Sequence, residues 1–179
     1  MQITTERLLL REVLLGDVSI IHELNSFPEV DEFNTMGIPE SKAVTEKLVA
    51  EILESQIVEP RIRYVYVIQD NVRDKFIGLI GLAMGKPNYR SAEIWYKIHP
   101  HHWKKGSAAE AVNGILQFGF TNLKLHRIEA GCATGNVGSI KVLEKTGFKR
   151  EGLARKILPI RGQWVDNYGY AILEEDFKL

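Results

Sequence analysis

Basic and small residues stand together in HHWKKGSAAEA, residues 101–111, immediately before an alanine-rich segment with the composition of a helix. The first amides of a helix have no partner within the helix, and the helix dipole favours negative charge at that end. Gly106 allows close approach of the backbone, and Lys104 and Lys105 add positive charge. The segment therefore predicts an anion site that uses main-chain N–H groups.

Three other interpretations bear on this segment: a helix capping box, a Walker A loop and a dinucleotide-binding loop. Ser107 and Glu110 fit the S-x-x-E pattern of a capping box, which satisfies the free amides internally, and the segment alone leaves this alternative open. A Walker A loop is excluded because its lysine follows the glycine, whereas here both lysines precede Gly106. The sequence also lacks the G-x-G-x-x-G pattern of dinucleotide-binding folds.

Histidine and cysteine residues raise the question of a metal or a nucleophile. A structural zinc site needs four ligands in tetrahedral geometry, and neighbours such as His101 and His102 point apart, so His99 does not complete a site with them. We expect no metal. Cys132 in EAGCAT is interpreted as a small buried strand residue, because neither a helix start nor an adjacent base accompanies it.

The length and composition of the chain limit its class. With 179 residues, 45% of them hydrophobic, it suits one domain over residues 1–179. Its 23 basic and 23 acidic residues cancel, which argues against a nucleic-acid or membrane-surface partner. No stretch approaches the roughly 18 apolar residues of a membrane span. The single cysteine and the polar start MQITTER indicate a cytoplasmic protein without a signal peptide.

Strand-like and helix-like segments alternate along the chain, which favours an α/β or α+β fold. Residues 41–56 are predicted as a helix with Val44, Leu48 and Ile52 on one side. Further helices are expected over residues 16–25 and 136–147 and in the segment that includes Ala108 and Leu116. The seven predicted strands cover residues 6–13, 63–70, 75–85, 91–100, 126–134, 148–158 and 164–173.

Two motifs together resemble a known family. HPHHWKKGSAAEA, followed about 25 residues later by NVGSIKVLEKTGFKREG, is similar to the acetyl-CoA site of the GNAT acetyltransferases, specifically the Rim-type branch that acetylates ribosomal-protein N-termini. The likeness extends from TTERLLLRE to the closing WVDNYGYAIL. It implies a mixed, mostly antiparallel twisted sheet of about seven strands, flanked by helices, with two splayed central strands.

The resemblance implies acetyl-CoA as cosubstrate and assigns its binding residues. The pyrophosphate loop falls on Trp103 to Ala108, so that main-chain amides of Lys104, Lys105, Gly106, Ser107 and Ala108 converge on the phosphates, while Ala108 and Ala109 leave room for the cofactor. Pantetheine is expected to add to the splayed strand EIWYKI, which ends at Ile98. Trp103 and Lys104 depart from the superfamily pattern, and Lys104 stands where the branch usually has glycine.

Acetyl transfer to an amine needs a base, an oxyanion donor and an acid. The resemblance points to Glu93 as the base; the alternative is an exposed carboxylate or one paired with Lys97. Asn136 is assigned to cofactor binding, with an N-cap as the alternative. The family's usual tyrosine acid falls on Leu143, so Ser139 is expected to supply the proton.

The resulting hypothesis is an enzyme that transfers acetyl from acetyl-CoA to a primary amine, either a protein N-terminus or a small molecule. The alternative is a noncatalytic acyl-CoA-binding module. Residues 25–41 are acidic and irregular, which favours a cationic acceptor. Trp95, Tyr96 and Trp164 either line the acceptor pocket or pack in the core, with packing favoured. The oligomeric state stays open, and a homodimer is one option.

Overall fold

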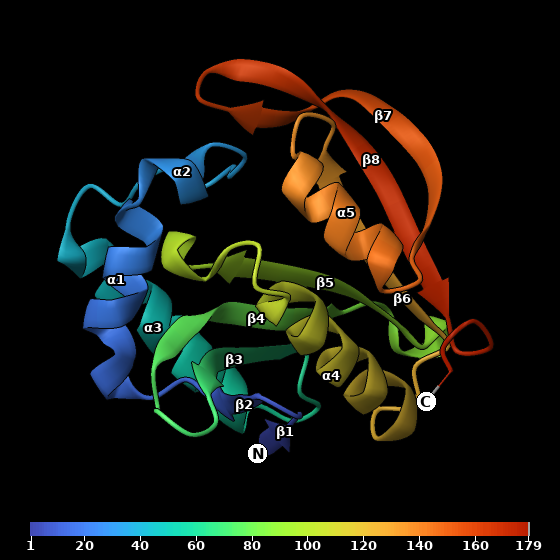
Figure 1. Cartoon of the computed structure of the whole chain (residues 1–179), viewed down its shortest axis with the longest axis horizontal. Coiled ribbons are helices and arrows are strands. Elements are labelled where there is room, and N and C mark those ends of the chain that lie inside the picture. Colours follow the sequence, from blue (N-terminus) through green and yellow to red (C-terminus); the bar gives the residue numbers. More distant parts are fainter. Residues whose placement is uncertain (179) are drawn as a thin grey trace.

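The computed structural model describes residues 1–178, which form one eight-stranded sheet in the order β1-β2-β3-β4-β5-β6-β8-β7 (Figure 1). The strands are β1 Gln2–Thr4, β2 Leu8–Glu12, β3 Arg63–Asp70, β4 Phe76–Met84, β5 Ser91–Ile98, β6 Arg127–Ala133, β7 Lys149–Ile160 and β8 Gln163–Leu173. The helices are α1 Val18–Ser26, α2 Pro28–Asp31, α3 Lys42–Ile57, α4 Ser107–Thr121 and α5 Val137–Lys145.

The predicted α/β class and the order of its elements are confirmed, with two additions. The sheet has eight strands instead of about seven, because the three-residue strand β1 pairs antiparallel with β2 at the sheet edge. The short helix α2 lies within residues 25–41, which were expected to be irregular. Within residues 1–178, none of the helices has the length and apolar character needed to cross a membrane.

Helices cover both faces of the sheet and create two cores. On one face α4 and α5 pack over the strands, with Val112, Ile115 and Leu143 among the buried residues. On the other face α1 and α3 cover the N-terminal half of the sheet. The buried side of α3 is formed by Thr45, Val49 and Ile52.

The predicted apolar side of α3 was therefore wrong in part. Val44 is 50% exposed and Leu48 is only partly buried, whereas Ile52 is buried as expected. The predicted apolar side of the helix is therefore rotated by about one residue from the side that packs on the sheet. Thr45 lies on that side, where its hydroxyl is 2.8 Å from Nδ1 of His22 in α1.

The central strands β5 and β6 form a fork. They pair in parallel only over Ser91–Glu93 and Arg127–Glu129, although β5 continues to Ile98 and β6 to Ala133. The predicted splay of these strands is confirmed. On its other side β5 pairs with β4 along its whole length.

Alternation in the β4–β5 ladder determines which main-chain groups of β5 face the fork. Main-chain bonds such as His99 N to Ile77 O and Gly85 N to Ser91 O show that odd-numbered residues of β5 bond to β4. The N–H and C=O groups of Ile94, Tyr96 and Ile98 consequently point towards the gap between β5 and β6.

The long β7–β8 hairpin arches beside α5 and closes the far side of the fork (Figure 1). Its tip is tied to α2, because Nε of Arg161 lies 3.2 Å from Oδ2 of Asp31 and Nη2 of Arg161 donates to the Pro28 carbonyl at 2.7 Å. Asp31 is buried, so this ion pair holds the N-terminal and C-terminal halves of the chain together on one side of the gap.

The start of α4 is fixed by a contact between distant segments, and the capping box that the sequence left open as an alternative is not formed. Gly106 is the N-cap residue and Ser107 is the first residue of the helix. The carboxylate of Glu110 instead accepts hydrogen bonds from Oγ1 of Thr5 at 2.6 Å and from the Arg7 amide at 2.7 Å. It also pairs with the Arg7 guanidinium at 2.6 Å. Glu110 therefore anchors α4 to the chain between β1 and β2 and leaves the first helical amides open.

This anchor predicts a pH-dependent contribution to stability. Burial opposes the charge of Glu110, but the bonds from Thr5 and Arg7 outweigh it and lower the pKa of the carboxyl group. A lowered pKa stabilises the fold above the ordinary value of about 4.3, and this contribution disappears as pH falls through the lower folded-state pKa. Glu110→Gln should cost about 1 kcal/mol at pH 7, or about 2–4 °C in melting temperature, and much less at pH 3.

Urea unfolding of Glu110→Gln at pH 7 and pH 3 tests this prediction. Glu51→Gln, at an exposed position of α3, is the control and should change stability little at either pH. An equal loss at both pH values for Glu110→Gln would mean that packing and not charge makes the anchor.

Candidate active site

The loop between β5 and α4 presents its backbone to an anion. Lys104 has φ +59° and Gly106 has φ +81°, so the chain takes two left-handed steps just before the helix. A left-handed conformation costs roughly 1–2 kcal/mol for a residue with a side chain, which accounts for the glycine expected at position 104 in related loops. The amides of Ser107, Ala108 and Ala109 form the first turn and have no intrahelical partner.

Trp103 fastens this loop to the end of β5. Its indole Nε1 donates to the Ile98 carbonyl at 2.7 Å. The Ile98 side chain is buried in the core. Because the Ile98 carbonyl is bonded to Trp103, the main-chain N–H is the polar group of Ile98 that remains free towards the fork. Trp103 thus acts as a structural support for the loop.

A cation that the sequence reasoning missed also borders the loop. Nη1 of Arg7 donates to the Lys105 carbonyl at 3.2 Å, and a Cβ added at Gly106 would lie 3.3 Å from Nη2 of Arg7. Lys104 and Lys105 are exposed, whereas Ala109 is buried beneath the loop. No local pattern links Arg7 to a loop 98 residues away, so only the fold reveals this guanidinium, which is also paired with Glu110.

The first turn of α5 forms the opposite wall of the fork. Oδ1 of Asn136 accepts a hydrogen bond from the Ser139 amide at 3.0 Å, so the N-cap interpretation of Asn136 is confirmed. The hydroxyl of Ser139 lies 2.7 Å from the Tyr96 hydroxyl, which comes from β5. Leu143 is buried in the core and carries no group for proton transfer.

The aromatic residues and the cysteine have different environments. Trp95 packs against the core beneath α1 and α3, whereas Trp164 is 60% exposed, so the packing interpretation is confirmed for Trp95 and wrong for Trp164. Cys132 is buried in β6 as expected. The ring of His99 packs edge-on against Phe27, with ring centroids 4.7 Å apart.

Glu93 occupies the point where the fork opens. It is the last residue of β5 that pairs with β6, opposite Glu129, and its side chain is exposed on the face away from α4. It lines a surface depression of about 260 Å³. The other residues around this depression are Arg127, Glu129, Ala130, Gly131, Glu151, Asn167, Gly169 and Tyr170.

The charges in this depression are unevenly paired. Arg127 binds both Glu129 and Glu151. Glu93 forms no ion pair within residues 1–178, and the suggested partner Lys97 instead donates to Oδ1 of Asn25 at 2.7 Å. The Glu93–Lys97 pairing was therefore wrong, and Glu93 presents an available carboxylate beside the fork.

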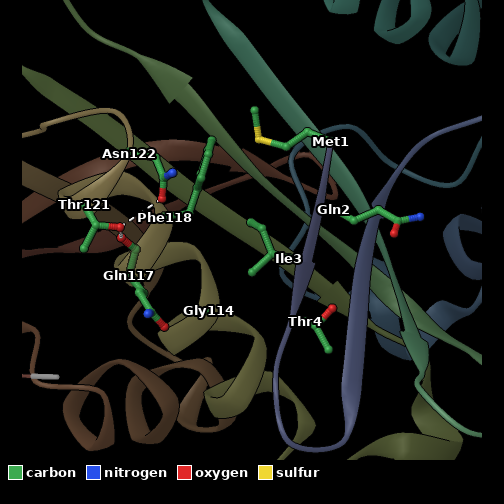
Figure 2. A pocket seen from close by; sticks show the side chains of 9 residues that line it. All are labelled: Met1, Gln2, Ile3, Thr4, Gly114, Gln117, Phe118, Thr121 and Asn122. Carbon is green, nitrogen blue, oxygen red and sulfur yellow. Dashed lines mark hydrogen bonds between the residues drawn. The ribbon is translucent and has the colours of Figure 1, made fainter.

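A second depression, of about 230 Å³, lies between β1 and α4 (Figure 2). Its lining residues are Met1, Gln2, Ile3, Thr4, Gly114, Gln117, Phe118, Thr121 and Asn122. Their side chains include no carboxylate, imidazole or thiol, and the Thr121 hydroxyl already donates to the Gln117 carbonyl at 2.7 Å. This depression therefore offers no group for acid–base chemistry, and the fork is the better candidate.

The family follows from a comparison with known domains. The model of the acetyltransferase (GNAT) domain matches residues 7–149, which include the fork, the loop and α5. The chain belongs to the GNAT acetyltransferases. It is 35% identical, over 99% of each chain, to the Uncharacterized N-acetyltransferase YnaD of Bacillus subtilis.

Solved structures agree with this assignment. The chain matches spermidine N-acetyltransferase from Vibrio cholerae, crystallised with CoA and spermine, at a TM-score of 0.85 and 28% identity, over 96% of this chain and 98% of that one. A ribosomal-protein-S5-alanine acetyltransferase from Vibrio fischeri shares the fold at a TM-score of 0.85 over the whole of both chains, but at 22% identity. The chain is thus an N-acetyltransferase that uses acetyl-CoA, and the noncatalytic alternative is not favoured.

The residues present fit acetyl-CoA. Open amides at the start of α4 suit a phosphate group, and the unpaired edge of β5 suits an extended chain that bonds through main-chain groups. When bound, acetyl-CoA supplies the activated acetyl group. The protein supplies the loop that orients it and the polar groups on either side of the fork.

The loop yields a test at a single position. Gly106→Asp should weaken CoA binding at least tenfold, because a carboxylate would stand among amides that face the phosphates. Gly106→Asn is the matched control, since both side chains tolerate the left-handed conformation and only aspartate adds charge. Calorimetric CoA titrations of both variants test whether the loop contacts the phosphates. Equal affinities would show that the loop does not contact phosphate.

Proposed function

We propose that this acetyltransferase acetylates a primary amine that carries additional positive charge, and that the amine enters from the face of the sheet that bears Glu93. The position of Glu93 carries the proposal. It lies at the opening of the fork, it is exposed, and it forms no ion pair within residues 1–178. A carboxylate in this place can hold an ammonium group and then accept its proton.

Charge around the entrance supports a cationic acceptor. The depression beside Glu93 contains two further carboxylates, from Glu129 and Glu151, and one cation, from Arg127. Residues 25–41 carry four carboxylates and no lysine or arginine; one of the four, Asp31, is paired with Arg161, which leaves three in excess. The similarity to a spermidine acetyltransferase at 28% identity supports the same class of acceptor.

In the proposed mechanism Glu93 is the base. An aliphatic amine has a pKa near 10.4, so it reaches the site as an ammonium ion and needs to lose a proton before its nitrogen can attack. Glu93 accepts this proton directly or through a water molecule. On the opposite wall the Ser139 hydroxyl supplies a proton to the departing sulfur.

Cofactor binding is assigned to both sides of the fork. The amides of Lys104, Lys105, Gly106, Ser107 and Ala108 bind the pyrophosphate, and Ala109 keeps the space beneath it clear. Ile98 contributes its main-chain N–H to the pantetheine arm, because its carbonyl is already bonded to Trp103. Asn136 contacts the cofactor with the part of its amide that does not cap α5.

An acceptor panel tests the proposed function. Thiol release from acetyl-CoA is measured with spermidine, with butylamine, and with a peptide that has a free N-terminus and no lysine. We expect kcat/KM for spermidine to exceed that for butylamine at least tenfold and to fall as salt is added. Preference for the peptide would favour the Rim-type branch, with a protein N-terminus as acceptor. Binding of acetyl-CoA without turnover of any amine would contradict the proposal.

The role of Glu93 is tested by Glu93→Gln, which keeps the shape and removes the basicity. Turnover should fall about 10² or more at neutral pH while acetyl-CoA affinity stays the same. The defect should shrink at high pH, because there a larger fraction of the amine has lost its proton without help. Glu46→Gln, on the exposed side of α3, is the control and should behave like the wild type. An unchanged pH–rate profile would exclude Glu93 as the base.

A further inference from the structure

One hydrogen bond crosses the fork between its two walls. Tyr96 extends from β5 beyond the point where β5 and β6 separate, and its hydroxyl lies 2.7 Å from Oγ of Ser139 in α5. The same hydroxyl is 3.4 Å from the Ser139 carbonyl oxygen. Within residues 1–178, no side-chain hydrogen bond other than these two joins β5 to α5, so the Tyr96–Ser139 contact determines how the two walls face each other.

The surroundings indicate which hydroxyl donates. Burial raises the pKa of the Tyr96 phenol well above its ordinary value, so the phenol keeps its proton throughout the neutral range. Within residues 1–178, Ser139 supplies both oxygen acceptors within its reach, and Oγ is much the nearer. The favoured arrangement is therefore donation from Tyr96 to Oγ of Ser139.

A hydroxyl that accepts in this way has its own hydrogen free for another acceptor. Ser139 cannot relax away, because its amide is bonded to Asn136 and its backbone is the first turn of α5. The Tyr96 hydroxyl is the one oxygen or nitrogen partner of Ser139 Oγ within residues 1–178. The Ser139 hydrogen is thus left to point into the fork or towards the weakly accepting sulfur of Cys132.

We propose that Tyr96 is a positioning residue that fixes the Ser139 hydroxyl so that its hydrogen is directed at the departing sulfur of acetyl-CoA. The inference rests on the proposed function. When the amine attacks the acetyl carbon, the C–S bond breaks and its electron pair stays on sulfur. The attacking nitrogen releases its excess proton to water, the sulfur takes the Ser139 proton, water returns the released proton to Ser139, and Tyr96 keeps its own.

This arrangement explains how the site works without a tyrosine in α5. Leu143 is buried among core residues and has no polar atom in its side chain. The phenol comes instead from β5, on the opposite wall, and acts through a serine that lies closer to the start of α5. The hydroxyl groups of Tyr96 in β5 and Ser139 in α5 thereby replace the single tyrosine hydroxyl that the family usually has in α5.

A double-mutant cycle tests the inference. Tyr96→Phe removes one oxygen and should lower kcat about tenfold while KM for acetyl-CoA changes less than twofold. Ser139→Ala should lower kcat by about 10- to 10³-fold. In the Ser139→Ala background, Tyr96→Phe should have no further effect, because Tyr96 acts only through that hydroxyl.

Tyr66→Phe is the matched control. Tyr66 is a buried tyrosine of β3, but its hydroxyl contacts Sδ of Met1 at 3.5 Å, away from the fork, so its removal should leave kcat unchanged. Circular dichroism confirms that each variant is folded, and thermal melting separates lost stability from lost turnover. Spermidine, or whichever amine the wild type acetylates fastest, serves as acceptor throughout.

The outcomes separate the two proposals. An active wild type in which Tyr96→Phe keeps full kcat, or in which the two substitutions act additively, overturns the positioning role and leaves the proposed function standing. A lower melting temperature with unchanged kcat shows that the Tyr96–Ser139 bond is structural and also overturns the role. A wild type that acetylates no amine contradicts the proposed function and this inference with it.

Discussion

The early end of pairing between β5 and β6 is the constraint on which the site depends. The two strands share only three residue pairs before they separate. Buried main-chain groups need hydrogen-bond partners, and a strand edge inside a sheet is an open place for an extended ligand. All eight strands still belong to one sheet, so the gap is a local feature between two neighbouring strands.

Separated strands stay apart because each is held from its other side. β5 is paired with β4 along its length, and Trp103 secures its last carbonyl. β6 is paired with β8, whose hairpin tip is tied to α2 through the Asp31–Arg161 pair. The Tyr96–Ser139 bond then sets the spacing across the gap. A single bond of this kind contributes only about 1 kcal/mol, so its value lies in orientation more than in stability.

The sequence predicts what is local and misses what is long-range. Element order and the loop at Gly106 follow from patterns within short windows, whereas the splay was expected only from the resemblance to the GNAT family. The S-x-x-E pattern failed because Thr5 and Arg7, more than 100 residues away, compete successfully for Glu110. The Tyr96–Ser139 bond joins residues 43 apart, and no spacing rule connects a strand tyrosine to the third residue of a later helix. β1 was missed because three residues cannot display an alternating pattern.

Strand alternation places the two proposed chemical groups on opposite faces of the sheet. Tyr96 packs on the core beneath α4, whereas Trp95, and with it Glu93 by the same parity, faces the other side. The fork is the one place along β5 that both faces can reach. Under the proposed function, an amine that meets Glu93 would enter from the face opposite the cofactor loop and the Tyr96–Ser139 pair. In the proposed function, the carboxylate that meets the acceptor is therefore separate from the residues that bind acetyl-CoA, and the two sets reach each other only through the fork.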